Sequence, residues 1–169
     1  MVPLAGVLSP NIFAGRLVTV DFGRGELRIG DRNAAPLGVG SPYANLHDGH
    51  ALPAIGVDVG GQAFNALIDT GAPGGLTFPY SMASSLPLTS APVRVGTVRF
   101  VDGEHARYSA TLVGDVRVGA LTLTNPEVEL IDGLPFVNIG MGLLRGMSIT
   151  LDPEARLVWL EPSEGPPQG

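Results

Sequence analysis

The most informative segment of this chain is Phe64-Asn65-Ala66-Leu67-Ile68-Asp69-Thr70-Gly71-Ala72. An apolar strand ends there in a carboxylate, which is followed by a β-branched hydroxyl residue and then by a glycine. Glycine adopts turn conformations that other residues avoid, so a tight turn is predicted directly after Asp69. The pattern therefore places the Asp69 carboxylate at the end of a strand. Because a bare Asp-Thr-Gly also arises by chance, the flanking sequence must support any assignment of function.

The composition fits a folded domain built from short strands and tight turns. The 169 residues are 44% hydrophobic, and 24 glycines and 15 prolines interrupt the apolar runs. Helix-compatible segments are limited to 80–86 and 141–145, which disfavours a βαβ architecture. We therefore predict an all-β fold with one or two short helices. The predicted strands are 17–22, 26–29, 54–59, 63–68, 93–101, 106–113, 116–118, 121–123, 127–131, 148–151 and 157–160.

Charge and cysteine content exclude several classes of function. The net charge is −6, and the ten basic residues are scattered arginines, so no nucleic-acid partner is predicted. No apolar run is long enough to span a membrane, and the N-terminal residues lack the pattern of a signal peptide. With no cysteine there is no disulfide and no thiolate zinc site. The compartment stays unknown, and a periplasmic or secreted location would require a leader upstream of Met1.

Two local patterns resemble ligand sites but are weak. His47-Asp48-Gly49-His50 places two imidazoles beside a carboxylate, yet no third ligand is evident, and a solvated loop is the preferred interpretation. Residues 140–146 contain three glycines, but the third is displaced from the dinucleotide-binding pattern and the helix that follows is too short. We predict neither a metal nor a cofactor.

A repeat links the two ends of the chain. Residues 12–29 match residues 143–160 without a gap, and Gly15 and Gly146, like Asp21 and Asp152, are 131 positions apart. Each copy has an apolar turn, a glycine, a strand that ends in Asp, and a second strand. We interpret residues 1–30 as the structured end of a preceding lobe, paired with the strands at 148–151 and 157–160. The alternative is two ordinary hairpins of similar pattern.

Two blocks of the sequence resemble bacterial retropepsin-like aspartic proteases. The first combines residues 57–64, the Asp-Thr-Gly-Ala at 69–72 and Leu76-Thr77-Phe78-Pro79; the second combines residues 136–146 with Ile149-Thr150-Leu151-Asp152. Their order and spacing are those of the family. The resemblance implies a closed antiparallel retropepsin/pepsin-like acid protease barrel over residues 51–162. A linker at 31–50 would precede this lobe, and a disordered tail at 163–169 would follow it.

The resemblance also implies roles for individual residues. Asp69 would be one half of a catalytic dyad, because the reaction needs two carboxylates that share a proton. The chain has a single Asp-Thr-Gly, so the second Asp would come from a dimer partner or from a missing first lobe. The implied support of the active-site loop comes from Thr70, Gly71, Ala72, Ile139 and Gly140.

A hairpin is predicted at residues 98–108, where apolar and polar residues alternate on both sides of an Asp-Gly turn. In the family such a hairpin is the flap that closes over substrate, and here its tip would be Asp102, Gly103, Glu104 and His105. These residues are more polar than the glycine-rich tip common in the family. An ordinary solvated hairpin is therefore an equal alternative.

The sequence thus predicts an aspartic endopeptidase lobe that hydrolyses peptide or protein substrates. It would work as a homodimer or with a companion lobe. The alternative is a non-catalytic module of the same fold that binds peptide or mediates assembly.

Overall fold

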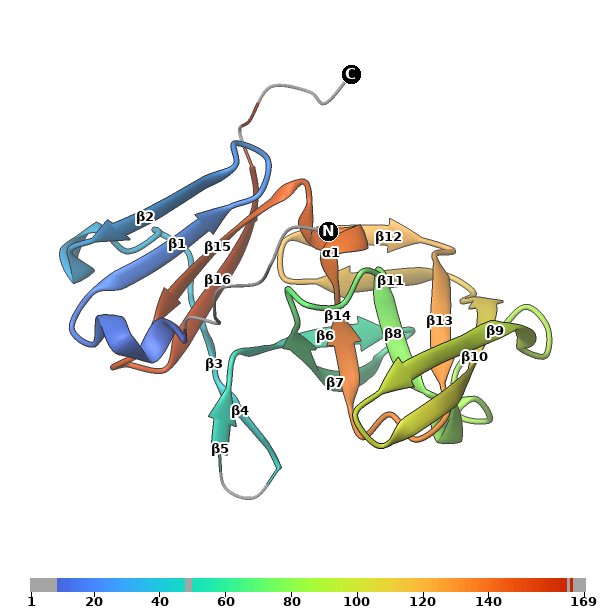
Figure 1. Ribbon diagram of the computed structural model, residues 1–169. Helices are drawn as coiled ribbons and strands as arrows, with labels where there is room; N and C mark the ends of the chain where they lie inside the picture. Colours follow the sequence, from blue (N-terminus) through green and yellow to red (C-terminus); the bar gives the residue numbers. More distant parts are fainter. Residues whose placement is uncertain (1–8, 48–49, 164, 166–169) are drawn as a thin grey trace.

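The computed structural model describes residues 9–47, 50–163 and 165, and this part of the chain is mostly β (Figure 1). Its helical elements are short. The α-helix is α1 (Met141–Leu144), and the 3-10 turns are η1 (Pro10–Phe13), η2 (Arg32–Ala34) and η3 (Tyr80–Met82). The segment predicted as helix-compatible at 80–86 thus forms only η3, while that at 141–145 forms α1. No helix in the described ranges has the length and apolarity needed to cross a bilayer.

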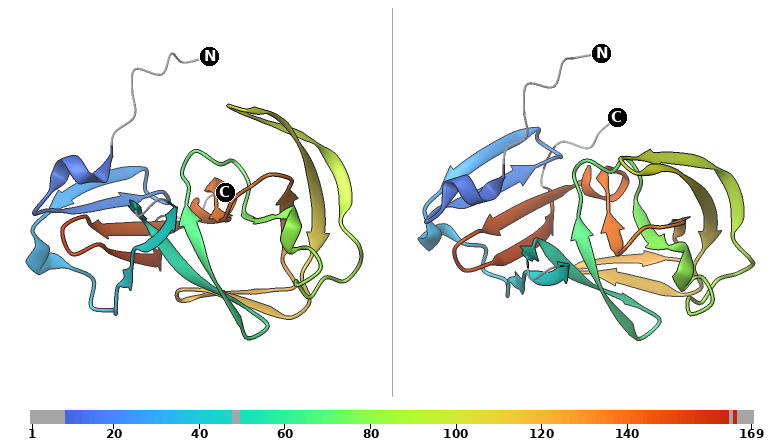
Figure 2. Two further views of the ribbon diagram at one scale, coloured as in Figure 1. Left: turned by 90° about the horizontal axis from the view of Figure 1, so that it is seen from below. Right: turned by 60° about the horizontal axis from the view of Figure 1, so that its bottom comes forward.

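Within the described residues, one sheet holds nine strands in the order β12-β11-β6-β7-β14-β8-β13-β10-β9. They are β6 (Ala54–Val59), β7 (Gln62–Ile68), β8 (Leu76–Pro79), β9 (Val93–Phe100), β10 (Gly103–Thr111), β11 (Asp115–Val118), β12 (Leu121–Thr124), β13 (Glu127–Ile131) and β14 (Val137–Ile139). Figure 2 shows that the sheet is strongly curled. Its pairs are antiparallel except β7 with β14 and β8 with β13, which are parallel. The mostly antiparallel β architecture is therefore confirmed.

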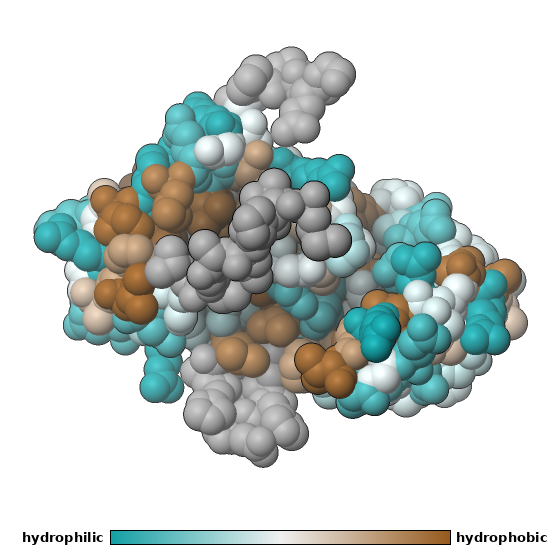
Figure 3. Space-filling model, in the orientation of Figure 1, coloured by the Kyte–Doolittle hydropathy of each residue, from teal (hydrophilic) through white to brown (hydrophobic). Residues whose placement is uncertain are grey.

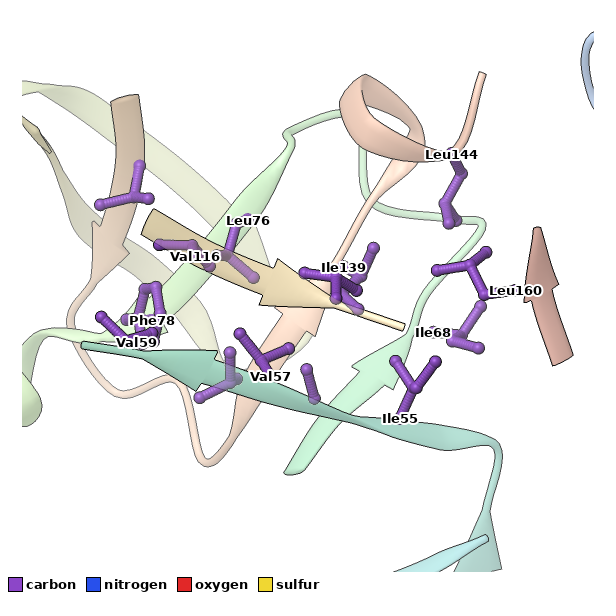
Figure 4. Packing of buried hydrophobic residues seen from close by; sticks show 14 of the residues in the cluster. Ile55, Val57, Val59, Ile68, Leu76, Phe78, Val116, Ile139, Leu144 and Leu160 are labelled. Atoms are coloured by element: carbon purple, nitrogen blue, oxygen red, sulfur yellow. The ribbon is translucent and has the colours of Figure 1, made fainter. Parts of the chain in front are cut away.

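Apolar side chains fill the inside of the curled sheet. Successive side chains of a strand point to opposite faces, and Ile55, Val57 and Val59 accordingly form one buried face of β6. Phe78 of β8 is fully buried, and its ring meets the ring of Phe64 edge-on, with 5.8 Å between the centroids. Figure 4 shows buried side chains, Val57 and Phe78 among them, converging from several strands. This core supports the strand ends at which the candidate site lies.

A second sheet joins the two ends of the chain. Within the described residues it has five strands in the order β2-β1-β15-β16-β3. They are β1 (Leu17–Asp21), β2 (Glu26–Gly30), β3 (Ser41–Pro42), β15 (Met147–Asp152) and β16 (Leu157–Pro162); β4 (Ala44–His47) and β5 (His50–Leu52) form a separate pair. In the five-stranded sheet, β1 pairs antiparallel with β15. The predicted pairing of the N-terminal hairpin with the C-terminal one is confirmed, and it forms within a single chain.

A local two-fold axis relates the two copies of the repeat. Thr19 and Thr150 are equivalent positions, 131 residues apart, and they pair directly across β1 and β15 with their Oγ1 atoms 3.0 Å apart. When equivalent residues of antiparallel strands face each other, a two-fold axis perpendicular to the sheet passes between them. The axis also relates β2 to β16, because β2 pairs with β1 at the positions equivalent to those at which β16 pairs with β15. At the same offset of 131 residues, η1 contacts β1 as α1 contacts β15.

The turns after β1 and β15 share one hydrogen-bonding pattern. Asp21 Oδ1 accepts from the N–H of Arg24, and Asp152 Oδ1 accepts from the N–H of Ala155, three residues on in each case. The Ser163 hydroxyl, which donates to Asp21, is the largest cause of a lowered pKa of that carboxyl. Burial raises the pKa of Asp152, but hydrogen bonds from Ala155 and Arg32 outweigh it, and the result is a lowered pKa. Both turns are therefore held by ionised aspartates.

The flanking segments contribute to the same sheet. The segment predicted as a linker, 31–50, contains η2, β3 and β4, and β3 pairs with β16. Trp159 Nε1 donates to the carbonyl of Gly38 at 2.9 Å. Of the tail predicted at 163–169, Ser163 contacts Asp21, while residues 164 and 166–169 lie outside the described residues. Residues 1–8, which were predicted to be structured with the rest of 1–30, also lie outside them.

Candidate active site

Asp69 follows the last residue of β7. Strand β14 runs parallel to β7 with Ile139 opposite Ile68, and the N–H of Asp69 donates to the Ile139 carbonyl at 2.9 Å. This bond continues the strand pairing by one residue. The Asp69 side chain is half-buried, whereas Thr70 and Gly71 are exposed. The structure therefore places the carboxylate at a strand end, at the point where the chain turns.

Two donors hold the Asp69 carboxylate. The N–H of Gly71 donates to Oδ1 at 2.9 Å, and Asn138 Nδ2 donates to Oδ2 at 3.2 Å. An ionised carboxylate offers about four lone-pair positions, so about two remain for a water molecule or a second carboxyl group. The two bonds fix the plane of the carboxylate and leave it free to accept further partners.

The start of α1 holds the loop that follows Asp69. The N–H groups of Gly140, Met141 and Gly142 donate to the carbonyls of Gly75, Ala72 and Gly74 at 2.7, 2.8 and 2.8 Å. The contact is so close that a Cβ added to Gly140 would lie 2.7 Å from the Ala72 carbonyl oxygen. Ile139 and Gly140 thus contact the loop at both of its ends.

A cleft of about 450 Å³ opens beside Asp69. Asp69 and residues 71–74 line one side, and Val98, Phe100 and Arg107 of the β9–β10 hairpin line another. Glu129 also lines the cleft, where its Oε1 lies 3.4 Å from Arg107 Nη1. Apolar walls with a few convergent polar groups are the usual composition of a ligand site.

The stem of the β9–β10 hairpin borders the cleft, and the turn lies at Val101 and Asp102. Asp102 Oδ1 is 3.0 Å from His105 Nε2, and this hydrogen bond lowers the pKa of Asp102. The His105 ring also lies against Gly133, where an added Cβ would come within 2.6 Å of Nδ1. The predicted hairpin is confirmed, while a flap role for Asp102, Gly103, Glu104 and His105 stays a prediction.

Asn138 is a site residue that does not belong to the predicted set. It lies in β14 between Val137 and Ile139, both buried, and is itself 8% exposed. Among the described residues its Oδ1 atom is buried without a hydrogen-bond partner. Burying a polar group is costly unless it is paired, so an isolated Asn within an apolar strand was a usable signal.

Metal binding has no support from the residues that the structure describes, which contain no group of three or more His, Asp or Glu side chains placed for an ion. Of the weak His47-Asp48-Gly49-His50 pattern, residues 48 and 49 lie outside the described ranges.

Comparison with known proteins gives the same family as the sequence blocks. A family model described as aspartyl protease matches residues 55–149, which is more than half of the chain. No curated protein matches. Among solved structures, the chain is similar to the crystal structure of a retropepsin-like aspartic protease from Rickettsia conorii, with 21% identity and a TM-score of 0.49 over 72% of this chain and 99% of that one. The resemblance found in the sequence is confirmed, and the chain belongs to the aspartyl protease family.

Proposed function

We propose that this chain is one lobe of an aspartic endopeptidase, in which Asp69 is one of two catalytic carboxylates. The observation that carries the proposal is the setting of Asp69: a carboxylate at a strand end, oriented by Gly71 and Asn138, on the wall of a cleft. Membership of the aspartyl protease family supports the same chemistry. The proposal includes a lobe that closes into a barrel around its core.

The chemistry follows from two carboxyl groups that share one proton. Like charges a few ångströms apart cannot both ionise at low cost, so in the working form of such a pair one group is ionised and the other keeps the shared proton. The ionised group takes a proton from a water molecule as the water oxygen attacks the peptide carbonyl, and the protonated group gives its proton to the carbonyl oxygen. In this scheme Thr70, Gly71, Ala72, Ile139 and Gly140 support the loop, and the β9–β10 hairpin covers an extended peptide with Asp102, Gly103, Glu104 and His105 at its tip.

The second carboxylate comes from a partner in this scheme. Glu129 lines the same cleft, but its carboxylate is already paired with Arg107, so the scheme does not use it as the second carboxylate. The partner is either a second copy or a companion lobe. Extended peptide or protein segments are the substrates.

The test is cleavage of an unstructured peptide mixture by the assembled protein, with products identified by mass spectrometry. We expect internal peptide bonds to be cut. Binding of peptides without any cut, in an assembly that places a second carboxylate next to Asp69, would favour the alternative of a non-catalytic binding or assembly module.

Asn138→Ala tests how the site is oriented. A hydrogen bond to a charged group is worth about 1.5–3 kcal/mol, so we expect kcat/KM for peptide cleavage to fall by about ten- to a hundredfold. Asn65→Ala is the matched control, because Asn65 is exposed on the neighbouring strand β7. Equal activity of the two variants would show that the Asn138 amide does not position Asp69.

A further inference from the structure

The two halves of the five-stranded sheet are alike in sequence but differ in what covers them. In β16, Val158 and Leu160 are 0% and 4% exposed. Their equivalents in β2, Leu27 and Ile29, are 58% and 43% exposed. Ile12 in η1 is 60% exposed, although its equivalent, Leu143 in α1, packs against the core. One half is therefore covered and the other is open.

The covered and the open residues lie on one face of the sheet. Residues directly opposite each other on neighbouring strands point to the same side. The register gives two continuous rows, Ile29-Val18-Leu151-Val158 and Leu27-Val20-Ile149-Leu160. Figure 3 shows apolar surface at this end of the molecule, over the five-stranded sheet. This face is therefore buried against the core at β16 and exposed to solvent at β2.

The curled lobe is what covers the β16 half. Leu160 belongs to the same buried cluster as Ile55 and Ile68, which lie near it in Figure 4. Next to it, α1 holds the loop of Asp69 through the bond from Met141 to Ala72. Because the local two-fold axis carries α1 onto η1 and β16 onto β2, it also carries this lobe to a position over Leu27 and Ile29.

We propose that Ile12, Leu27 and Ile29 form the seat of a companion lobe that has the fold of residues 54–139 and uses β1 and β2 as its closing hairpin. The seat would then be buried as Val158 and Leu160 are. The inference rests on the proposed function in one respect, namely that the companion's own aspartate is the second carboxylate. The loop that carries this second aspartate would then be related to the loop of Asp69 by the same two-fold axis.

A second copy of this chain does not fit the seat. The companion lobe would pack on the hairpin β1–β2. In each copy of this chain that hairpin already belongs to the five-stranded sheet, since β1 pairs with β15 of the same chain. A copy docked on Leu27 would bring its own hairpins into the space that β1 and β2 occupy. The companion is therefore a lobe without a closing hairpin.

Thiol labelling tests the seat directly, because the chain has no cysteine of its own. Leu27→Cys introduces a single thiol into the seat. Leu37→Cys is the control, since Leu37 is 108% exposed and lines a hollow with Thr19, Thr150 and Arg28 on the opposite face of the sheet. The companion probe is a second copy of residues 51–131 placed directly ahead of Met1, so that the 131-residue offset continues without a break.

The expected result is a difference in the rate of maleimide labelling between the chain alone and the extended protein. The thiol of the Leu27→Cys variant should react rapidly in the chain alone and at least about tenfold more slowly in the extended protein. The thiol of the Leu37→Cys variant should react equally fast in both.

The outcomes separate this inference from the proposed function. Protection of the Leu27→Cys thiol without peptide cleavage by the extended protein supports the seat and contradicts the proposed activity. Cleavage by extended proteins whose Leu27→Cys and Ile29→Cys thiols react as fast as in the chain alone overturns the seat. Protection of the Leu27→Cys thiol in the chain alone, together with a dimer in sedimentation, also overturns it, because a second copy would then be the occupant.

Discussion

Replacing Asp69 by Asn should abolish peptide cleavage by the assembled protein, with kcat/KM lower by about 10²–10⁴-fold or more. The amide keeps the shape of the side chain but cannot share or accept the proton that the reaction moves. Its single carbonyl oxygen can accept from Gly71 or from Asn138, but its amide group cannot, so one of the two hydrogen bonds is lost. The measurement is the steady-state rate on a peptide substrate, together with the melting temperature.

Asp58→Asn is the matched control for Asp69→Asn. Asp58 also accepts a hydrogen bond from a backbone N–H, that of Gly61 at 3.2 Å, but it lies in the β6–β7 hairpin outside the cleft. We expect its cleavage rate to equal that of the unmodified protein. If Asp69→Asn retained the same rate as Asp58→Asn, the catalytic carboxylate would have to lie elsewhere.

Gly140→Ala should lower both stability and activity. Gly140 has φ −103 and ψ −176, a conformation that alanine adopts freely, so backbone strain is not the cause. The added Cβ instead meets the carbonyl oxygens of Gly74 and Ala72, the latter at 2.7 Å. These atoms belong to the backbone and cannot rotate away, so the loop of Asp69 has to move. Overpacking of this kind costs about 1–3 kcal/mol, and sometimes more.

Gly146→Ala is the control for this effect, since a Cβ there meets no atom within 4 Å. Urea denaturation of the two variants measures the difference in the free energy of unfolding. We expect a lower denaturation midpoint and little cleavage for Gly140→Ala, and values close to the unmodified protein for Gly146→Ala. Equal midpoints and rates would show that the loop is not held by this contact.

The features of the site that depend on residues adjacent in the chain could be predicted from the sequence. Asp69 lies at a strand end because an apolar run, a carboxylate and a turn glycine follow one another within a few residues. The hairpin around Asp102 and Gly103 follows from alternation on both sides of a turn. The β1–β15 pairing is a long-range contact, and it was predictable because the repeat marks both strands.

Other features depend on packing between distant segments and leave little trace in the sequence. Strands β8 and β14 are absent from the predicted set because they are short and buried throughout, so they show no alternation of apolar and polar residues. The parallel pairing of β8 with β13 and of β14 with β7 also could not be derived from the spacing of strands along the sequence. The bond from Asn138 to Asp69 and the pair of Arg107 with Glu129 exist only once β14, β10 and β13 have taken their places in the sheet.

If this chain provides one half of a catalytic dyad, a crystal structure of the assembled two-lobed protein should show the other half beside Asp69. The quantity to measure is the distance between the carboxylate oxygens of Asp69 and the nearest other carboxyl oxygen. We predict about 3 Å, the separation of two carboxyl groups that share a proton. A nearest carboxyl group more than about 6 Å away would show that Asp69 is not half of such a dyad, because at that distance no proton is shared.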